Sequence, residues 1–306
     1  MSRELAKPRL FTVVVNERSG GGRAGRVLPN VVRYLQEHLA TAEVNVVLPQ
    51  SFEEAEDVCR SAALASREGD ALIVMGGDGM AHLGLNACAH AKATLGIIPA
   101  GTGNDFARAV GVPKSIRLAV RAIAHGNIRT VDLAELSNHH RPRRHVGAVV
   151  STGYDAQVNR ATNKSRLRLG ALSYGWIALR ELREFQPLSY RLSIDGVERE
   201  QDAMLVAVSN TGVFGGGMRI APDADMTDGV LDLTIIHPVS RGVLLRLLPL
   251  LYTGGFVKHP SVELLRVQSI TIDGEGLFVM GDGEELGRVP VTISADPGAL
   301  RVFVES

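Results

Sequence analysis

The chain has 306 residues, a length that predicts two domains of about 150 residues each. Hydrophobic residues make up 45% and charged residues 22%, which is typical of globular proteins and excludes long disordered stretches. The 33 Lys and Arg residues balance 33 Asp and Glu, and this neutrality disfavours nucleic acid as a partner. Two cysteines, Cys59 and Cys88, are too few for a disulfide framework, so we expect buried free thiols in a reducing compartment.

Hydrophobic runs are short throughout the chain. No stretch reaches the ~18 uncharged apolar residues that span a bilayer. The nearest, 242–252, contains Arg246 and Pro249, and the run 11–15 is too short for the apolar core of a secretory signal. The sequence therefore predicts a soluble or peripheral protein.

Strand and helix patterns alternate over the first 130 residues. Strands are expected at 10–16, 43–48, 70–75 and 94–98. Helices are expected at 25–39 and 52–67 and after the last two strands, and Ser51 with Glu54 forms a capping box. This alternation predicts a parallel sheet with helices on both faces.

Strand patterns dominate after Val131 and predict an antiparallel sandwich. Asp195-Gly196, between two alternating runs, indicates a hairpin, and the basic stretch 139–145 is expected to be a loop. The expected strands are 146–151, 188–194, 203–209, 230–236, 262–272, 277–280 and 289–293, with helices at 171–185 and 241–252.

Three glycine-rich loops, 16–25, 76–80 and 99–108, each follow a predicted strand. In an open parallel sheet, ligands bind beyond the carboxyl ends of the strands, where glycines let backbone N–H groups approach phosphates. The first loop lacks the Lys-Ser/Thr of a P-loop, and Gly101-Thr102-Gly103 lacks the third glycine of the dinucleotide fingerprint. The loops predict a phosphate site of another type.

Two of these loops resemble motifs of the bacterial diacylglycerol kinase family, which includes sphingosine kinases. They are Gly76-Gly77-Asp78-Gly79 and the more specific 101–108 string Gly-Thr-Gly-Asn-Asp-Phe-Ala-Arg. The resemblance continues to Val304 through three later segments, Gly153-Tyr154-Asp155-Ala156, Asp228-Gly229-Val230-Leu231-Asp232 and Asp282-Gly283-Glu284.

The resemblance implies a three-layer α/β nucleotide-binding domain, similar to phosphofructokinases and NAD kinases, and a mainly antiparallel β-sandwich domain. We expect the ATP-binding domain at 1–132, with the segment 296–306 returning to it, and the lipid-substrate domain at 133–295. The implied activity is ATP- and Mg²⁺-dependent phosphorylation of a lipid hydroxyl (EC 2.7.1.-). Diacylglycerol is the favoured acceptor and phosphatidic acid the product, a reaction of phospholipid biosynthesis.

Other functions stay open at this point. One is a kinase for another lipid alcohol, such as a sphingoid base or an acylglycerol, and another is a non-catalytic nucleotide- or lipid-binding regulator. The presence of Glu284 and Asp78 argues against a silent protein. A soluble NAD kinase would share the Gly-Gly-Asp-Gly turn but would not account for Asp282-Gly283-Glu284.

The family pattern assigns roles to particular residues. Glu284 is the expected general base for the attacking hydroxyl, Asp282 supports it or the metal, and Asp78 holds Mg²⁺ at the nucleotide. The resemblance also implies a second, structural Mg²⁺ at the carboxylate of Asp228, with backbone oxygens near Asp225 and Val230. The expected nucleotide-binding residues are Asn16, Ser19, Gly20, Gly76, Gly77, Asp78, Gly79, Met80, Gly101, Thr102, Gly103, Asn104 and Asp105.

Two details depart from or complicate the pattern. Met80 stands where the family usually has a Thr, which removes a hydroxyl near the nucleotide. Asp-Gly-Glu occurs twice, and we interpret Asp273-Gly274-Glu275 as a loop because only the second triplet precedes the family's Pro and Pro-Gly-Ala-Leu.

A lipid substrate requires contact with a membrane surface, so we expect a cytoplasmic protein that transiently visits the inner face of the membrane. A basic segment beside an apolar-aromatic helix (172–177) could provide that contact, or could be a solvated face beside a core helix. A homodimer is left open. The basic residues are Arg160, Lys164, Arg166 and Arg168.

Overall fold

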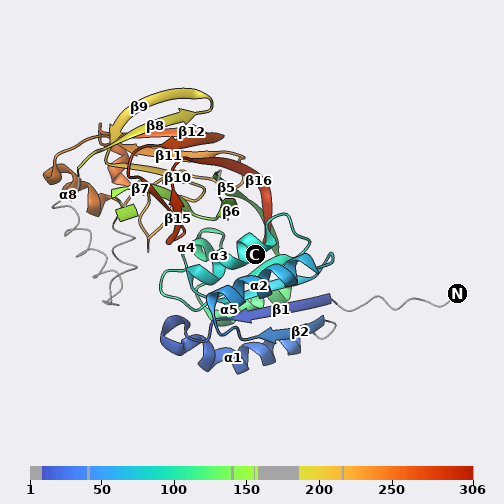
Figure 1. The fold of residues 1–306 in the computed structure, drawn as a ribbon. Coiled ribbons are helices and arrows are strands. Elements are labelled where there is room, and N and C mark those ends of the chain that lie inside the picture. Colours follow the sequence, from blue (N-terminus) through green and yellow to red (C-terminus); the bar gives the residue numbers. More distant parts are fainter. Residues whose placement is uncertain are drawn as a thin grey trace. The chain divides into compact units, whose positions relative to one another are not determined.

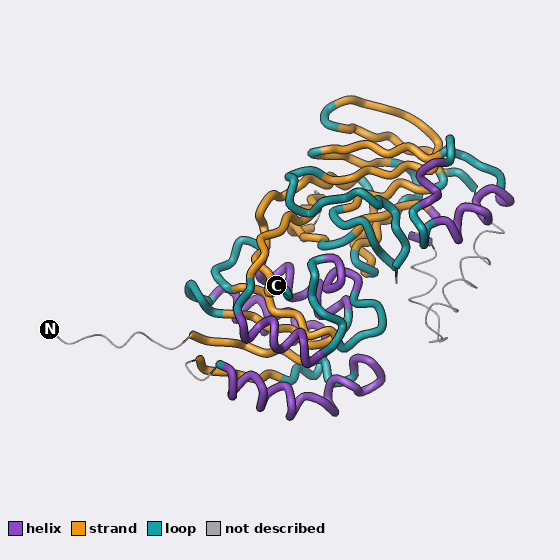
Figure 2. Tube along the Cα trace, turned by 180° about the vertical axis from the view of Figure 1, so that it is seen from behind, coloured by secondary structure: helices purple, strands orange, loops and turns teal. Residues whose placement is uncertain are grey.

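The structure is a computed structural model that describes residues 9–39, 42–138, 141–154, 156–157, 186–215 and 217–305. It divides into two compact units, residues 1–131 with 299–306 and residues 132–298. Helices are concentrated in the first unit and strands dominate the second (Figure 2). The predicted helix 171–185 and the basic residues at 160–168 lie outside the described residues.

The first unit contains a parallel sheet in the order β2-β1-β3-β4-β16. β3 and β4 are buried along their whole length, as expected of strands covered on both faces. The strands are β1 (Arg9–Val15), β2 (Ala42–Val47), β3 (Ala71–Gly76), β4 (Thr94–Pro99) and the last residues of β16 (Val291–Phe303).

Helices cover both faces of this sheet and form three layers. α1 (Ser19–His38) and α5 (Ile116–His125) pack together on one face, and α2 (Phe52–Leu64) and α3 (Asp78–Cys88) pack together on the other. Figure 1 shows α1 and α2 on opposite sides of β1. The short helix α4 (Asp105–Ala109) follows the third glycine loop. The Ser51 cap forms as predicted, with its hydroxyl accepting from Glu54 N at 3.1 Å, whereas the Glu54 carboxylate accepts from Gln50 N, one residue before the amide of a regular capping box.

The second unit is a sandwich of two largely antiparallel sheets. One sheet has the order β12-β11-β10-β7-β14-β15, and the other joins β16, β13, β8 and β9, with β5 and β6 beside β16. Its strands are β5 (Ile128–Asn138), β6 (Arg141–Val146), β7 (Val149–Gly153), β8 (Leu188–Ile194), β9 (Val197–Ala203), β10 (Leu205–Ser209), β11 (Leu231–Ile236), β12 (Val262–Val267), β13 (Ser269–Asp273), β14 (Phe278–Gly281) and β15 (Glu284–Arg288).

The core of the sandwich comes from the inward faces of both sheets. Val206 and Leu233 of one sheet pack in the same buried cluster as Leu192, Ile270 and Ile293 of the other. A second cluster lies under α8 (Arg241–Leu250) and the 3₁₀ helix η1 (Gly255–Lys258). The predicted fold class, an α/β domain followed by a β-sandwich domain, is confirmed.

Several local predictions are wrong. The expected strands 146–151 and 203–209 each begin with the last residue of one strand, Val146 of β6 or Ala203 of β9, and continue in β7 or β10 of the other sheet. Residues 139–145 were expected to form a loop, yet Arg141–Val146 form β6, which pairs with β5. The basic residues of this segment suggested a loop, but a strand at the edge of a sheet also tolerates charged side chains. The run 262–272 was expected to be one strand, but it breaks at Gln268 into β12 and β13, which belong to different sheets. Among the described residues, no helix is both long and apolar enough to span a bilayer.

Candidate functional site

The first unit has a topological switch point between β1 and β3. β1 has β2 on one side and β3 on the other, so the chain proceeds in opposite directions from this point of the sheet. The loop after β1 starts beside the end of β3, because Asn16 N donates to the Met75 carbonyl at 3.0 Å. Ligands of open α/β sheets bind at this position.

All three glycine-rich loops meet there. The amides of Ala100 and Gly101 donate to the Gly76 carbonyl at 2.7 and 3.1 Å. A Cβ atom at Gly20 would collide with the Ala100 carbonyl, and one at Gly101 would collide with the backbone of Gly77. Glycine is therefore required here by the close approach of three backbones.

Asp78 joins the second loop to the third. Its Oδ2 accepts from Asn104 N at 2.8 Å and its Oδ1 accepts from Asp105 N at 2.7 Å. Asn104 has a left-handed backbone, with φ 55°, and its side-chain oxygen accepts from Gly101 N at 3.1 Å. Because an ionised carboxylate oxygen has more than one acceptor position, Asp78 can bind these amides and still face a cation.

A cavity of about 230 Å³ lies against the third loop. Arg23, Arg108 and Lys114 line it, together with the 101–104 backbone, and its lining contains no acidic residue. Arg108 Nη2 is held by the Gly103 carbonyl at 2.8 Å. Three cations and a glycine-rich backbone form a site suited to a polyanion such as a polyphosphate. Our reading of the sequence did not single out Arg23 or Lys114.

The predicted nucleotide residues Ser19 and Met80 both lie at the end of β3. A Cβ atom built on Gly76 would lie 3.2 Å from Ser19 Oγ and would collide with the Met80 side chain. Met80 is buried, so its side chain fills space between α3 and the strand. Thr102 is exposed on the third loop.

The comparisons with known proteins agree over both units. Residues 10–136 match the family model described as diacylglycerol kinase catalytic domain, and residues 148–304 match the YegS C-terminal NAD kinase beta sandwich-like domain. A protein of Mycobacterium tuberculosis (strain ATCC 25618 / H37Rv) named diacylglycerol kinase is 36% identical over 295 residues, covering 95% of this chain and 94% of that protein. The chain belongs to the diacylglycerol kinase family.

Other relatives extend this family assignment. A diacylglycerol kinase of Bacillus subtilis (strain 168) is 28% identical over 242 residues, covering 78% of each chain. A crystal structure of a diacylglycerol kinase from Bacillus anthracis str. Sterne shares the fold, with a TM-score of 0.74 at 22% identity over 98% of both chains. Membership in the family supports a lipid kinase activity, with ATP as phosphoryl donor and a lipid as acceptor.

The Asp-Gly-Glu segment predicted for catalysis forms a hairpin in the second unit. Asp282 and Gly283, with φ 50° and 85°, make the two-residue turn between β14 and β15. The Asp282 carboxylate accepts from Gly147 N and Ala148 N, both at 2.8 Å, which fixes the turn. Glu284 is the exposed first residue of β15, whereas Glu275 lies in the turn between β13 and β14.

The predicted second Mg²⁺ site lies on the turn before β11. Asp225 Oδ1 accepts from Thr227 N at 3.0 Å, and Asp228 Oδ1 accepts from Val230 N at 3.2 Å. The other oxygen of Asp228 pairs with Arg266. Carboxylate and backbone oxygens are the ligands Mg²⁺ prefers, so this donor set fits the ion, which would share Asp228 with the guanidinium.

Asp132 holds this turn in place, and our sequence analysis missed it. The side chain is 4% exposed. Its Oδ2 accepts from Gly229 N and its Oδ1 from Gly298 N, both at 2.8 Å. The signal in the sequence was an acidic residue between Val131 and Leu133, since a charge inside an apolar strand is retained only where it is bonded.

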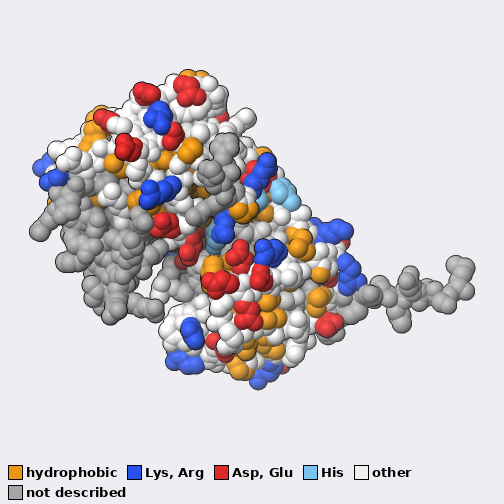
Figure 3. Space-filling view, viewed as in Figure 1, with side chains coloured by type: hydrophobic (Ala, Val, Ile, Leu, Met, Phe, Trp, Pro, Cys, Tyr) orange, Lys and Arg blue, Asp and Glu red, His pale blue; other side chains and the backbone are white. Residues whose placement is uncertain are grey.

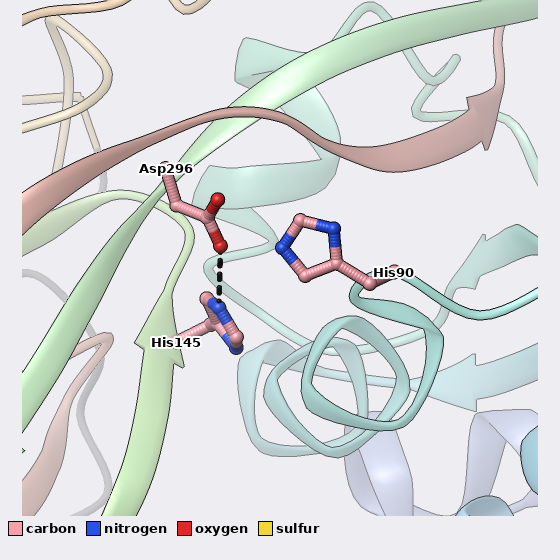
Figure 4. A group of neighbouring side chains, drawn as sticks. All are labelled: His90, His145 and Asp296. Atoms are coloured by element: carbon pink, nitrogen blue, oxygen red, sulfur yellow. Dashed lines mark hydrogen bonds and ion pairs between the residues drawn. The ribbon is translucent and has the colours of Figure 1, made fainter.

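Asn210 links two of the segments that hold the predicted site residues of this unit. Its Nδ2 donates to the Asp132 carbonyl at 2.8 Å and to the Gly147 carbonyl at 3.0 Å. Gly147 in turn donates to Asp282. Nearby in the chain, His145 donates to Asp296 at 2.9 Å, as the dashed line in Figure 4 shows. Predicted site residues of the second unit thus share one hydrogen-bonded scaffold.

Proposed function

We propose that this protein transfers the γ-phosphoryl group of ATP to the free hydroxyl of diacylglycerol, giving phosphatidic acid and ADP. One observation carries the proposal: in a diacylglycerol kinase family fold, the third glycine loop and three cations, Arg23 of the first loop among them, line a cavity that has no acidic residue in its lining. Phosphoryl transfer depends mainly on positioning and on neutralising phosphate charge, which this cavity can provide.

The proposed nucleotide site is the set of loops 16–25, 76–80 and 99–108. Backbone N–H groups of the loops donate to phosphate oxygens, and Arg23, Arg108 and Lys114 balance their charge. Asp78 keeps the second and third loops together while the polyphosphate is bound.

In the proposed reaction the lipid hydroxyl oxygen forms a bond to the γ-phosphorus as the bond from that phosphorus to the ADP oxygen breaks. Glu284 accepts the hydroxyl proton, a role open to an exposed carboxylate. Asp282 is a positioning residue, because both its oxygens bind backbone amides that fix the turn carrying Glu284.

Magnesium has two proposed positions. Asp78 would hold one ion at the nucleotide, and the Asp228 carboxylate with backbone oxygens near Asp225 and Val230 would hold a second, structural ion. Bound Mg²⁺ supplies positive charge against phosphate at the first position and stiffens the turn at the second.

The two units take different substrates in this proposal. The first, with its glycine loops, binds ATP, and the second, with Glu284, receives the lipid. The protein would act in the cytoplasm and visit the inner face of the membrane, where its substrate resides.

The direct experiment supplies the purified protein with γ-labelled ATP, Mg²⁺ and a panel of lipid alcohols in mixed micelles. The panel contains diacylglycerol, monoacylglycerol and a sphingoid base. We expect label in phosphatidic acid. Label in another lipid product would identify a different acceptor. The absence of any labelled lipid would overturn the proposal.

The two Asp-Gly-Glu triplets provide a matched pair of variants. Glu284→Gln keeps the shape of the side chain but cannot accept a proton, so kcat should fall by about 10² to 10⁴ while ATP still binds. Glu275→Gln alters an identical residue in a turn and should behave as wild type. A dead Glu275 variant beside an active Glu284 variant would move the base to the other triplet.

A further inference from the structure

Helix α8 carries apolar side chains on two sides. Its inner side is buried, with Leu244 and Leu247 each 3% exposed. These leucines pack into the second core cluster of the sandwich unit, whose members include Leu205, Ala207 and Phe256. Burial of this side accounts for the attachment of the helix to the fold.

Large apolar side chains also occur on the exposed side, between arginines, and the attachment does not explain them. Leu245 is 46% exposed, Leu250 is 41% exposed and Tyr252, just past the helix, is 49% exposed. A surface helix normally presents charged or polar side chains outward. Three large apolar side chains within eight residues instead indicate a surface that contacts a membrane or another protein.

Positive charge borders these side chains. Arg241, Arg246 and Lys258 are exposed, and no Asp or Glu occurs between Asp232 and Glu263. Figure 3, drawn in the view of Figure 1, shows Lys or Arg side chains at the outer end of α8. The whole chain has no net charge, so the excess of positive charge beside α8 is local.

We infer that the α8 surface, made of Arg241, Leu245, Arg246, Leu250, Tyr252 and Lys258, docks onto an anionic lipid bilayer. Leucines enter the acyl boundary, a tyrosine lies at the headgroup level, and the cations meet anionic headgroups. The inference rests on the proposed lipid kinase function, because it supplies the contact that a bilayer substrate requires.

Charge argues against a second copy of the chain as the occupant. A two-fold dimer through α8 would bring the same three cations of each copy together, and like charges across an interface cost binding energy. An anionic bilayer has the opposite charge and also accepts exposed leucines. The surface therefore complements a membrane better than it complements itself.

Vesicle binding of the full-length protein tests this surface. Sedimentation is measured with vesicles of phosphatidylcholine alone and with vesicles that also contain phosphatidylglycerol, at low and high salt. Wild type should bind the anionic vesicles and release them in salt. Arg241→Gln with Arg246→Gln should weaken that binding by about tenfold or more. Leu245→Ser with Leu250→Ser should weaken it at every salt concentration.

A control variant combines one substitution of each kind on α2 of the first unit. Arg60→Gln with Leu64→Ser removes one exposed cation and a leucine that is 81% exposed, and should leave vesicle binding unchanged. Vesicle binding that is insensitive to both α8 variants would overturn the inference. A fall in oligomer mass in light scattering, with vesicle binding retained, would also overturn it and assign the surface to a second copy.

Kinase assays separate this inference from the proposed function. On a short-chain, water-soluble diacylglycerol without vesicles, the α8 variants should match wild type, whereas on diacylglycerol in anionic vesicles they should be slow. If the protein is inactive on every lipid alcohol but its vesicle binding still depends on α8, the proposed kinase function is wrong and the membrane-binding role of the α8 surface stands. If the protein is fully active but its vesicle binding does not depend on α8, the kinase function stands and the inference about the α8 surface is wrong.

Discussion

The Oδ2 atom of Asp78 lies 2.8 Å from the backbone nitrogen of Asn104, and Oδ1 binds the next amide at 2.7 Å. Asp78 belongs to the first turn of α3, and Asn104 directly precedes α4. One carboxylate thus joins two of the three loops at the switch point. Its position within the Gly-Gly-Asp-Gly motif gives that motif a structural role in addition to any metal binding.

Asp78→Asn should weaken ATP binding. An amide has one acceptor oxygen, so its NH₂ group would face the N–H of Asn104 or Asp105 and leave a donor unsatisfied. A hydrogen bond to a charged group contributes about 1.5–3 kcal/mol, which predicts a loss of about tenfold to a hundredfold. A fluorescent ATP analogue measures it, with Asp57→Asn on the exposed face of α2 as control. Unchanged affinity would contradict a clamping role.

Gly101→Ala should separate the second and third loops, because its Cβ atom would collide with the Gly77 backbone. Backbone cannot rotate away as a side chain can, so we expect more than about a tenfold loss in kcat/KM for ATP. Gly242→Ala is the control, since a Cβ atom there meets no atom within 4 Å. Equal activity of the two variants would show that the loops tolerate the displacement.

Asp132→Asn should destabilise the turn that carries Asp225 and Asp228. The carboxylate accepts from Gly229 N and Gly298 N, and an amide can satisfy only one of them. A buried unsatisfied donor costs about 1–3 kcal/mol, which should lower Tm by several degrees. Mn²⁺ binding, followed by electron paramagnetic resonance, should weaken as well.

Asp202→Asn is the control for that variant, because Asp202 is exposed and accepts from the Ser189 hydroxyl of the neighbouring strand. It should change neither Tm nor Mn²⁺ binding. Full Mn²⁺ affinity in Asp132→Asn would show that the buried carboxylate does not support metal binding at the turn that carries Asp225 and Asp228.

Glu263→Gln should change the acid sensitivity of the sandwich. Arg199 on β9 donates two hydrogen bonds, at 2.9 and 2.8 Å, to Glu263 on β12, and they hold the pKa of that carboxyl below 4.5. A carboxyl with a lowered pKa stabilises the folded state above its unfolded pKa and loses that contribution as pH falls through the folded pKa.

The Tm difference between wild type and Glu263→Gln should therefore be present above the ordinary pKa of the carboxyl and shrink as pH falls through its lowered pKa; His237, which also binds this carboxylate at 3.0 Å, adds to the difference in mild acid where the imidazole is charged. Because the pair is partly exposed, we expect a difference of about 1 kcal/mol, or a few degrees. Glu198→Gln, at the exposed start of β9, should show no such pH dependence. A difference that grows as pH falls below the ordinary pKa of the carboxyl would contradict this account.

Several features of this protein follow from sequence alone. The strand-helix alternation, the Ser51 cap and the Asp195-Gly196 hairpin depend on neighbouring residues, so local patterns predict them. The glycine loops also lie where the strands end, because parallel strands bring their carboxyl ends to one edge of the sheet. Strand β6 escaped detection because its basic residues suit an edge, a position that only the sheet defines.

Tertiary structure decided which separated residues bind one another. Asp78 to Asn104, Asp132 to Gly229 and Asp282 to Gly147 are contacts 26, 97 and 135 residues apart in the chain. No local pattern encodes such a pairing, because each depends on how strands far apart in sequence align in a sheet. The buried and exposed sides of α8 follow the same rule. Sequence predicted that helix, but only packing against the sandwich determined which leucines are buried and which remain at the surface.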